Sequence, residues 1–391
     1  MKKFLVAVFV LAALCATGAC SRKDKKIDPP AELVDFVPRV TVQKLWSESI
    51  GGGEKKLRIG LAPAALDGKV YAAAHSGDVV ALEAANGRKL WSVETKRPLS
   101  AGPGAGAGLV VVGSEKGDVI ALRIESGADV WRVKVGGELL SAPAVGSDAV
   151  IVRTVDGRLR ALALADGHEL WTVDQTVPRL SLRGAAPPVL VGETVLCGFD
   201  NGKVVAVNVK TGDVLWESAV APAKGRTELE RLVDIDSAVE VADQDVYVVG
   251  FQGRAAMLAL DSGQIWWARD ASSYRGLALD PDALYIADSD GSVIAMKRKD
   301  GSEIWRQDLL HRRGLSAPVV DGGAVVVADY QGYVHWIDRS DGAIVGRASS
   351  GGDRVTRPIV ADGIVLVQNE SGSLSAFRSQ PSGRKSGTSG G

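Results

Sequence analysis

Short apolar runs separated by glycine-containing turns recur along most of the chain. Residues 140–173 show the pattern clearly, with the runs SAPAVG, AVIVRT, RLRALALA and HELWTV following one another. Two of the intervening turns contain Asp-Gly, which favours tight hairpins because both central residues of the preferred turn take positive φ. This segment is therefore predicted to form four antiparallel strands, the content of one β-propeller blade.

The third run of this segment occurs eight times, and most copies lead into a glycine that is followed four residues later by tryptophan. About 42 residues separate successive glycines, which is within the range of propeller blades. We expect each tryptophan to dock its blade against the next one. The glycines are Gly87, Gly127, Gly167, Gly212, Gly263, Gly301 and Gly342, and the tryptophans are Trp91, Trp131, Trp171, Trp216, Trp267 and Trp305, with none after Gly342.

The eighth copy of the third run, at residues 371–379, has no downstream turn, whereas the run VQKLWSES around Trp46 has no strand before it. Joining the two completes an eighth blade and removes the open sheet edges that invite aggregation. The sequence thus predicts an all-β fold over residues 39–379. It is an eight-bladed β-propeller of four-stranded antiparallel blades, closed by the N- and C-terminal strands.

Both ends of the chain have the composition of non-globular segments. Residues 1–19 combine Lys2 and Lys3 with a short apolar run and small residues, as in a secretory signal peptide too short to span a bilayer. Cys20 then stands where a bacterial lipobox carries its lipidated cysteine, although Thr17 occupies the position usually held by leucine, so cleavage without lipidation stays open. Residues 20–38 are expected to be a lipidated tether and residues 380–391 a disordered tail.

Composition and charge argue against several classes of function. The mature chain would carry a charge of about −3, which gives no support to nucleic-acid binding. Cys197 would have no disulfide partner once the signal is removed and Cys20 is lipidated, and we expect it to be a small buried hydrophobe. The histidines show no metal-ligand spacing, so each is expected to be structural or exposed. They are His75, His168, His311 and His335.

The repeat ALxAxxGxxxW resembles that of quinoprotein dehydrogenases, which bind pyrroloquinoline quinone at the centre of an eight-bladed propeller. That resemblance implies an alternative function, a quinone-dependent dehydrogenase or a cofactor-binding propeller. The adjacent cysteines and calcium-binding acidic residues expected of such an enzyme are not evident. Uptake of the quinone with a shifted absorption band and reduction of a dye would favour this alternative.

Four segments outside the repeat resemble the BamB lipoprotein family of the outer-membrane β-barrel assembly machinery, and the resemblance extends from about Trp46 to Phe377. They are LSLRG (180–184), ELERLVDID (228–236), DLLHR (308–312) and GYVHWI (332–337). The resemblance implies a non-catalytic periplasmic scaffold without a cofactor, lipid-anchored at the outer membrane through Cys20. It also implies binding to the POTRA region of the barrel subunit BamA, to other assembly components and to unfolded outer-membrane proteins. The contact residues that it implies are Leu180, Leu182, Arg183, Asp234 and Asp236.

Loop lengths point to the same residues independently. The links after Trp171 and Trp216 span about 13 and 21 residues, whereas the others span about 8 to 11. Consecutive links emerge on one face as neighbours, and long loops on a rigid scaffold often bind partners. Two alternatives stay open: the leucines could plug their loop onto the blade, and the aspartates could be solvated or pair with Arg183. A capping box from Thr227 predicts a short helix.

Overall fold

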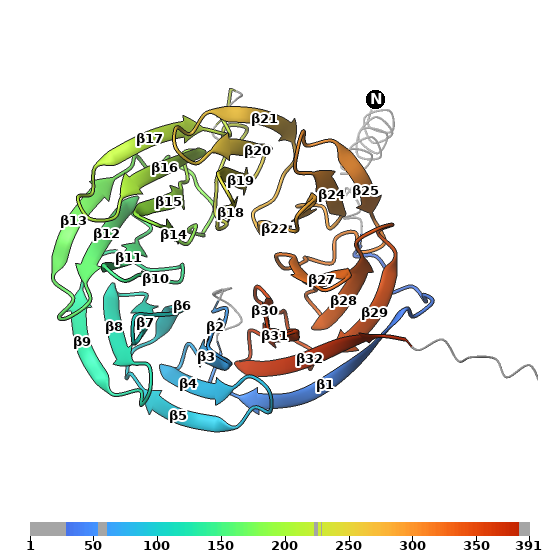
Figure 1. Cartoon of the computed structure of the whole chain (residues 1–391), viewed down its shortest axis with the longest axis horizontal. Helices are drawn as coiled ribbons and strands as arrows, with labels where there is room; N and C mark the ends of the chain where they lie inside the picture. The colour runs from blue at the N-terminus through green and yellow to red at the C-terminus, as the bar shows by residue number, and fades with distance from the viewer. Residues whose placement is uncertain (1–28, 54–60, 223–225, 228, 383–391) are drawn as a thin grey trace, which may run out of the picture. The chain divides into compact units, whose positions relative to one another are not determined.

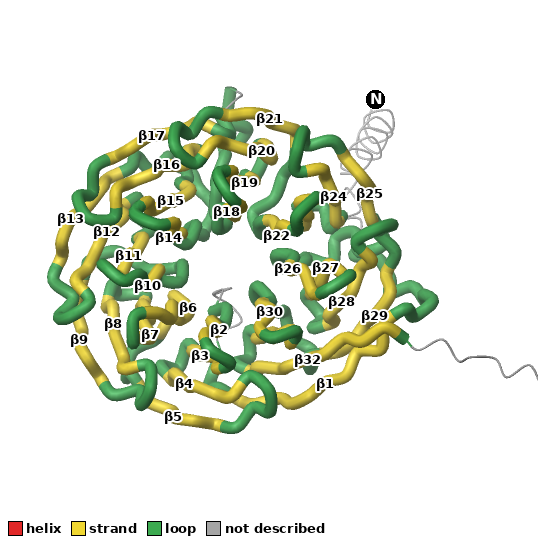
Figure 2. The backbone as a smooth tube through the Cα atoms, in the orientation of Figure 1, coloured by secondary structure: helices red, strands yellow, loops and turns green. Residues whose placement is uncertain are grey.

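The computed structural model describes residues 29–53, 61–222, 226–227 and 229–382. From Ala31 onward these residues form one compact unit. Every regular element in the described part is a β-strand, and the strands form eight four-stranded antiparallel sheets. The sheets stand around a common centre as blades (Figure 1), with the loops at their ends (Figure 2). The predicted eight-bladed propeller is confirmed.

Blades 1 to 7 each run from the innermost strand to the outermost one, and the short inner strands face the centre. Blades 1 to 4 comprise β2 (Ala64–Leu66), β3 (Lys69–Ala73), β4 (Asp78–Glu83), β5 (Lys89–Glu94); β6 (Leu99–Gly106), β7 (Leu109–Ser114), β8 (Asp118–Arg123), β9 (Asp129–Lys134); β10 (Ala144–Val145), β11 (Ala149–Arg153), β12 (Arg158–Ala163), β13 (Glu169–Asp174); β14 (Val189–Val191), β15 (Thr194–Gly198), β16 (Lys203–Asn208) and β17 (Val214–Ala219). Blades 5 to 7 comprise β18 (Glu240–Ala242), β19 (Asp245–Val249), β20 (Arg254–Ala259), β21 (Ile265–Asp270); β22 (Leu277–Leu279), β23 (Ala283–Ala287), β24 (Val293–Lys297), β25 (Glu303–Gln307); β26 (Val319–Asp321), β27 (Ala324–Ala328), β28 (Tyr333–Asp338) and β29 (Ile344–Ser349).

The eighth blade is built from both ends of the chain, as expected. It contains β30 (Ile359–Ala361), β31 (Ile364–Gln368), β32 (Ser373–Pro381) and, outermost, β1 (Val40–Ser49). β1 pairs with β32 from Val40 opposite Pro381 to Ser49 opposite Ser373. The pairing of Val40 with Pro381 extends β32 two residues beyond residue 379, the predicted end of the propeller.

Tryptophan and glycine latch each blade to its neighbour. The indole N–H of each of seven tryptophans donates to a backbone carbonyl of the next blade at 2.8–2.9 Å, beginning with Trp46 to Ala84. The ring packs on the turn glycine of that blade: a Cβ at Gly87, where φ is +74°, would lie 2.7 Å from the Trp46 ring. Positive φ and this close approach both require glycine. The predicted docking role of tryptophan is confirmed.

A β-bulge lies just before the tryptophan position in every outer strand, and in blade 7 that position is occupied by Gly346. In blade 5, for example, Met257 pairs with Trp267 but Leu258 pairs with Ile265, so Trp266 is the extra residue. The same shift occurs in the other seven blades. A bulge locally interrupts the ladder and redirects side chains. In blades 3 to 6 the tryptophan packs inward while the residue before it is exposed.

The segment expected to be a tether contacts the propeller from Ala31 onward. The Ala31 N–H donates to His311 O at 2.9 Å, and the Arg313 guanidinium donates to Ala31 O at 2.8 Å. Residues 1–28 and 383–391, which include the predicted signal peptide, Cys20 and most of the tail, lie outside the described residues. Within the described part, no helix has the length and apolarity that a membrane crossing needs.

Candidate functional site

The two longest links lie between consecutive blades. Residues 175–188 join β13 to β14, and residues 220–239 join β17 to β18. Asp234 of the second link accepts a hydrogen bond from the backbone N–H of Leu182 in the first. The prediction that the two links lie next to each other is therefore confirmed, and blade 4 lies between them.

The three residues predicted on the first link differ in exposure. The Leu180 side chain is 42% exposed, Leu182 is half-buried and Arg183 is exposed. Arg183 donates through Nη2 to Glu138 Oε1 at 2.5 Å, which ties this link to the one before blade 3. Arginine is enriched among the residues that dominate binding energy at protein interfaces, so Arg183 is suited to a protein contact.

The two aspartates point to the same side, as the alternation predicts, but that side is covered by the first link rather than open to a partner. Asp234 is fully buried and bonded to the Leu182 N–H. Asp236 packs on Gly184, where a Cβ would lie 2.7 Å from the carboxyl carbon. The expectation that both carboxylates face a partner is therefore corrected. They contact the loop backbone, which places the 180–184 segment.

A buried charge pair lies close to these aspartates. Arg153, at the end of β11, is fully buried and pairs with Asp200, and its guanidinium stacks 4.8 Å from the centre of the Phe199 ring. Because Asp200 already neutralises Arg153, the two link aspartates share little of its positive charge. Burial raises the pKa of Asp234 to about 6. Burial, followed by the neighbouring Asp234 carboxylate, raises the pKa of Asp236 to about 8.

Sequence reasoning missed Glu138, Arg153 and Asp200. One signal was available for Arg153, since an arginine ends the apolar run AVIVR at a position where six of the other seven blades have glycine, alanine or valine. Its partner Asp200 belongs to the next blade, and no local pattern connects the two. Glu138 lies in a short link with no distinguishing motif.

The capping box forms without a helix. The Glu230 carboxylate accepts from the N–H groups of Arg226 and Thr227 at 2.7 and 3.1 Å, and the Glu230 N–H donates to Thr227 Oγ1 at 3.2 Å. Of the residues that follow, the structure describes 229–231, and these form a turn. The predicted short helix is therefore wrong, because a single capped turn is too short to propagate. Leu229 in this turn is strongly exposed.

The candidates for other chemistry are structural. His335 is buried and hydrogen-bonded to Asp329 at 3.2 Å, as expected for a core histidine. Cys197 is buried, and burial raises the pKa of its thiol to about 11. Across the described residues, no group of three or more His, Cys, Asp or Glu side chains is placed to hold a metal ion.

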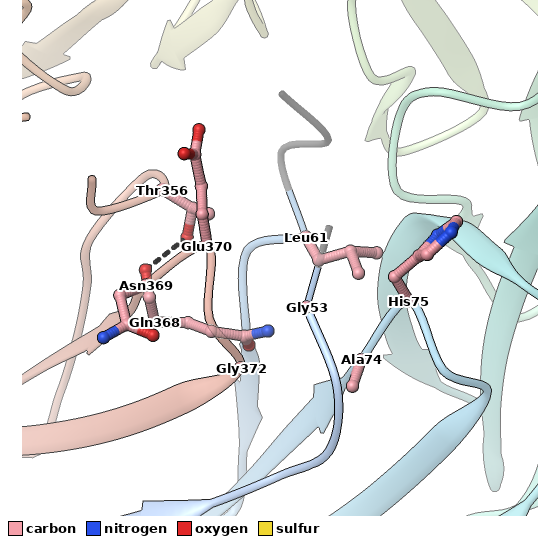
Figure 3. Close-up of a pocket in the computed structure, with 9 residues that line it drawn as sticks. All are labelled: Gly53, Leu61, Ala74, His75, Thr356, Gln368, Asn369, Glu370 and Gly372. Carbon is pink, nitrogen blue, oxygen red and sulfur yellow. Dashed lines mark hydrogen bonds between the residues drawn. The ribbon is translucent and has the colours of Figure 1, made fainter. Parts of the chain in front are cut away.

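A pocket lies where blade 8 meets blade 1 (Figure 3). Its lining includes Leu61, His75, Thr356 and Gln368, and its volume is about 10 Å³, close to the space needed for a single water molecule. Thr356 donates to Gln368 O at 3.1 Å within it, so part of its polar lining is already paired. Ligand pockets are usually larger, ~300–1,000 Å³.

The centre of the ring is crossed by an ion pair. Arg357, just before β30, contacts Glu240 in β18 at 2.6 Å. These strands belong to blades 8 and 5, on opposite sides of the centre in Figure 1. The position that the quinoprotein alternative assigns to its cofactor is therefore bridged by side chains.

The family model described as outer membrane protein assembly factor BamB matches residues 75–307 and 289–386. The chain belongs to the BamB family. A BamB from Pseudomonas aeruginosa is 49% identical over 94% of this chain and 97% of its own length. The one from Escherichia coli is 35% identical over 96% and 98%, respectively. The crystal structure of BamB from Moraxella catarrhalis aligns with a TM-score of 0.80 and 28% identity, over 86% of this chain and all of that one.

Quinoproteins share only the fold with this BamB family member. A quinohemoprotein alcohol dehydrogenase from Comamonas testosteroni aligns with a TM-score of 0.69 at 13% identity, over 86% of this chain and 76% of that one. Membership of a family of assembly factors, with relatives matched along nearly their whole length, indicates that the chain is not an enzyme. The quinone-dependent alternative is thereby set aside.

Proposed function

We propose that the protein is a scaffold of the machinery that assembles outer-membrane β-barrel proteins, and that it docks through the 180–183 segment onto the POTRA region of the barrel subunit BamA. The relatives named outer membrane protein assembly factor BamB support the general role. The observation that carries the docking site is the exposed Leu180 and Arg183 on a loop that buried groups hold in place. An anchor held in its binding geometry loses less entropy on association.

The five predicted residues have two different roles in this proposal. Leu180, Leu182 and Arg183 form the contact surface. Asp234 and Asp236 act from behind it: one accepts the Leu182 N–H and the other packs on Gly184. Cys20 would carry the lipid that holds the protein on the periplasmic side of the outer membrane, where it would also meet other assembly components and unfolded clients.

Capture of the barrel subunit from detergent-extracted membranes tests the docking site. We expect the lipidated protein carrying Leu182→Ala and Arg183→Ala to capture at least tenfold less of the barrel subunit than the wild type. Leu309→Ala is the matched control, because Leu309 is an exposed leucine on a different link. Undiminished capture by the double variant would refute the proposed site.

A second pair of variants separates contact from support. Asp234→Asn keeps an oxygen that accepts the Leu182 N–H, whereas Asp234→Ala removes it. We expect capture to survive the first change and to fall several-fold with the second, because a freed loop must be ordered again on binding. Equal loss in both variants would mean that the carboxylate charge, rather than its position behind the loop, matters.

A further inference from the structure

Four polar side chains form a hydrogen-bonded chain through blade 7. Arg313 and Asp329 are buried, and the Arg313 guanidinium donates through Nε to Asp329 Oδ2 at 2.8 Å. Arg347 donates through Nε to His335 Nδ1 at 3.2 Å, so the other ring nitrogen, Nε2, carries the hydrogen that His335 donates to Asp329 Oδ2 at 3.2 Å. We call Arg313, Asp329, His335 and Arg347 the clamp.

The propeller repeat does not require these groups. At the ladder position that His335 occupies in blade 7, blades 1, 2, 4 and 6 have Val80, Ile120, Val205 and Ile294. A buried ion pair often stabilises a core no more than well-packed apolar side chains of similar volume. The clamp therefore calls for a role beyond holding blade 7 together.

Both arginines of the clamp donate to the backbone of the N-terminal segment. Arg313 donates through Nη1 to Ala31 O at 2.8 Å, and Arg347 donates through Nη1 to Val34 O at 3.1 Å. The Ala31 N–H in turn donates to His311 O at 2.9 Å. A guanidinium has several N–H groups in a fixed plane, so it can bond inward to the clamp and outward to the segment at once.

One side chain of the segment adds apolar packing. The Phe36 ring centre lies 5.0 Å from the Arg347 guanidinium, and the ring packs against the buried cluster shared by blades 6 and 7. Residues 31–36 belong to no strand, and in Figure 1 the segment before β1 lies beside β29. The clamp and Phe36, rather than a β-ladder, therefore hold this segment on the ring.

The clamp holds the segment at the face that carries the docking links. Residues 308–318, which contain His311 and Arg313, join the outermost strand of blade 6 to the innermost strand of blade 7. Residues 175–188 and 220–239 make the same kind of connection. Because every blade has four strands of alternating direction, all such links emerge on one face. The N-terminal segment therefore meets the ring on the docking face.

We propose that the clamp fixes the point at which the membrane tether leaves the ring, so that the face carrying the 180–183 segment points toward the membrane surface. Ala31 is eleven residues after Cys20, which limits the distance between them to ~40 Å even for a fully extended chain. Without the clamp the first held residue would be Arg39, which bonds to Val345 of β29 at the rim, and the limit would rise to ~70 Å. The orientation rests on the proposed function, which places a lipid on Cys20.

A spin label on residue 32 tests the clamp in the purified protein. Glu32 is exposed and follows a clamped residue, so Glu32→Cys is the attachment point. The release variant combines Phe36→Ala with Arg313→Lys, which keeps a positive charge beside Asp329 but offers a single nitrogen. We expect the label to rotate at least threefold faster in the release variant. Val37→Ala is the matched control, because Val37 is an exposed residue of the same segment, and it should leave the rotation unchanged.

Energy transfer on vesicles tests the orientation. The lipidated protein is bound to vesicles of phosphatidylethanolamine and phosphatidylglycerol that contain a rhodamine-labelled lipid. A donor dye is attached through Leu229→Cys on the docking face or through Asp261→Cys in the turn before β21, on the opposite face; both residues are exposed. We expect at least twofold more transfer from residue 229 in the wild type, and the release variant should at least halve this excess. Arg347→Met, which removes the donor to Val34 O, should act in the same direction.

The possible results separate this inference from the proposed function. Equal label rotation in the wild type and the release variant would overturn the clamp, and equal transfer from residues 229 and 261 in the wild type would overturn the orientation. A protein that does not bind vesicles would refute the lipid on Cys20 and the orientation with it, while the spin label still decides the clamp. The release variant should capture the barrel subunit from detergent extracts as the wild type does; a loss there would mean that the clamp supports the docking links instead of the tether.

Discussion

Asp236 gives the protein a pH-dependent stability whose sign follows from its burial. In the folded protein the pKa of Asp236 is about 8, so the carboxyl group keeps its proton up to about that pH. In the unfolded chain the group loses its proton near pH 4. Between these values the unfolded state is favoured by proton release, so folding stability falls as pH rises. Each unit of pKa difference corresponds to ~1.4 kcal/mol, and the full span of about 4 units to about 5 kcal/mol.

Asp236→Asn removes this ionisation while keeping the size of the side chain beside Gly184. Because the unfolded wild type has already released the proton by pH 5, we expect the variant to be more stable there by only ~1–2 kcal/mol. Above pH 8 the variant should be more stable by several kcal/mol. The measurement is urea-induced unfolding between pH 5 and 8.5, followed by tryptophan fluorescence.

Asp261→Asn is the matched control for this comparison, because Asp261 is an exposed aspartate in the turn after β20. It should follow the wild-type profile. Parallel pH profiles for the wild type and Asp236→Asn would refute the reasoning. So would a wild type that gains stability over the variant as pH rises, because that would mean the Arg153 charge outweighs burial.

Three other outcomes follow from the fold. Trp267→Ala should lower the free energy of unfolding by ~3–5 kcal/mol in denaturant titrations, whereas its exposed neighbour Trp266→Ala should change it by less than ~0.5 kcal/mol; equal effects would contradict the latch. Gly301→Ala should destabilise as well, because its Cβ would lie 2.7 Å from the Trp267 ring at a φ of +69°, and thermal unfolding measures this. Cys197, buried with a raised thiol pKa of about 11, should resist maleimide at pH 8 until urea unfolds the chain; rapid labelling of the native protein would contradict its burial.

The fold was predictable because each blade repeats its own local signals. Asp-Gly turns, alternating apolar runs and the spacing from Gly87 to Trp91 are short-range features, and counting them also located the closing strand at Trp46. The bulges were not predictable. Leu215 and Trp266 are apolar and stand beside a latch residue, so pattern alone favours burial, whereas the register shift exposes both.

The lengths of the two links predicted where the candidate site lies, but they did not predict which way its side chains point. The neighbourhood of the 180–184 segment and Asp234 follows from blade order. The inward direction of the aspartates depends on long-range contacts, with Leu182 and Gly184 of the other link. No period or motif encodes which side of an extended link faces a neighbouring loop, so this part required the structure.

The pairing of β1 with β32 has a consequence for biogenesis. The first strand of the propeller is synthesised at the start of translation, and its partner is the last strand to be made. β1 must therefore wait, unpaired, until almost the whole chain has been made. A chain cut short before Ser373 would have seven blades and a stranded β1. The β1–β32 pairing therefore allows the ring to close only when the chain is complete.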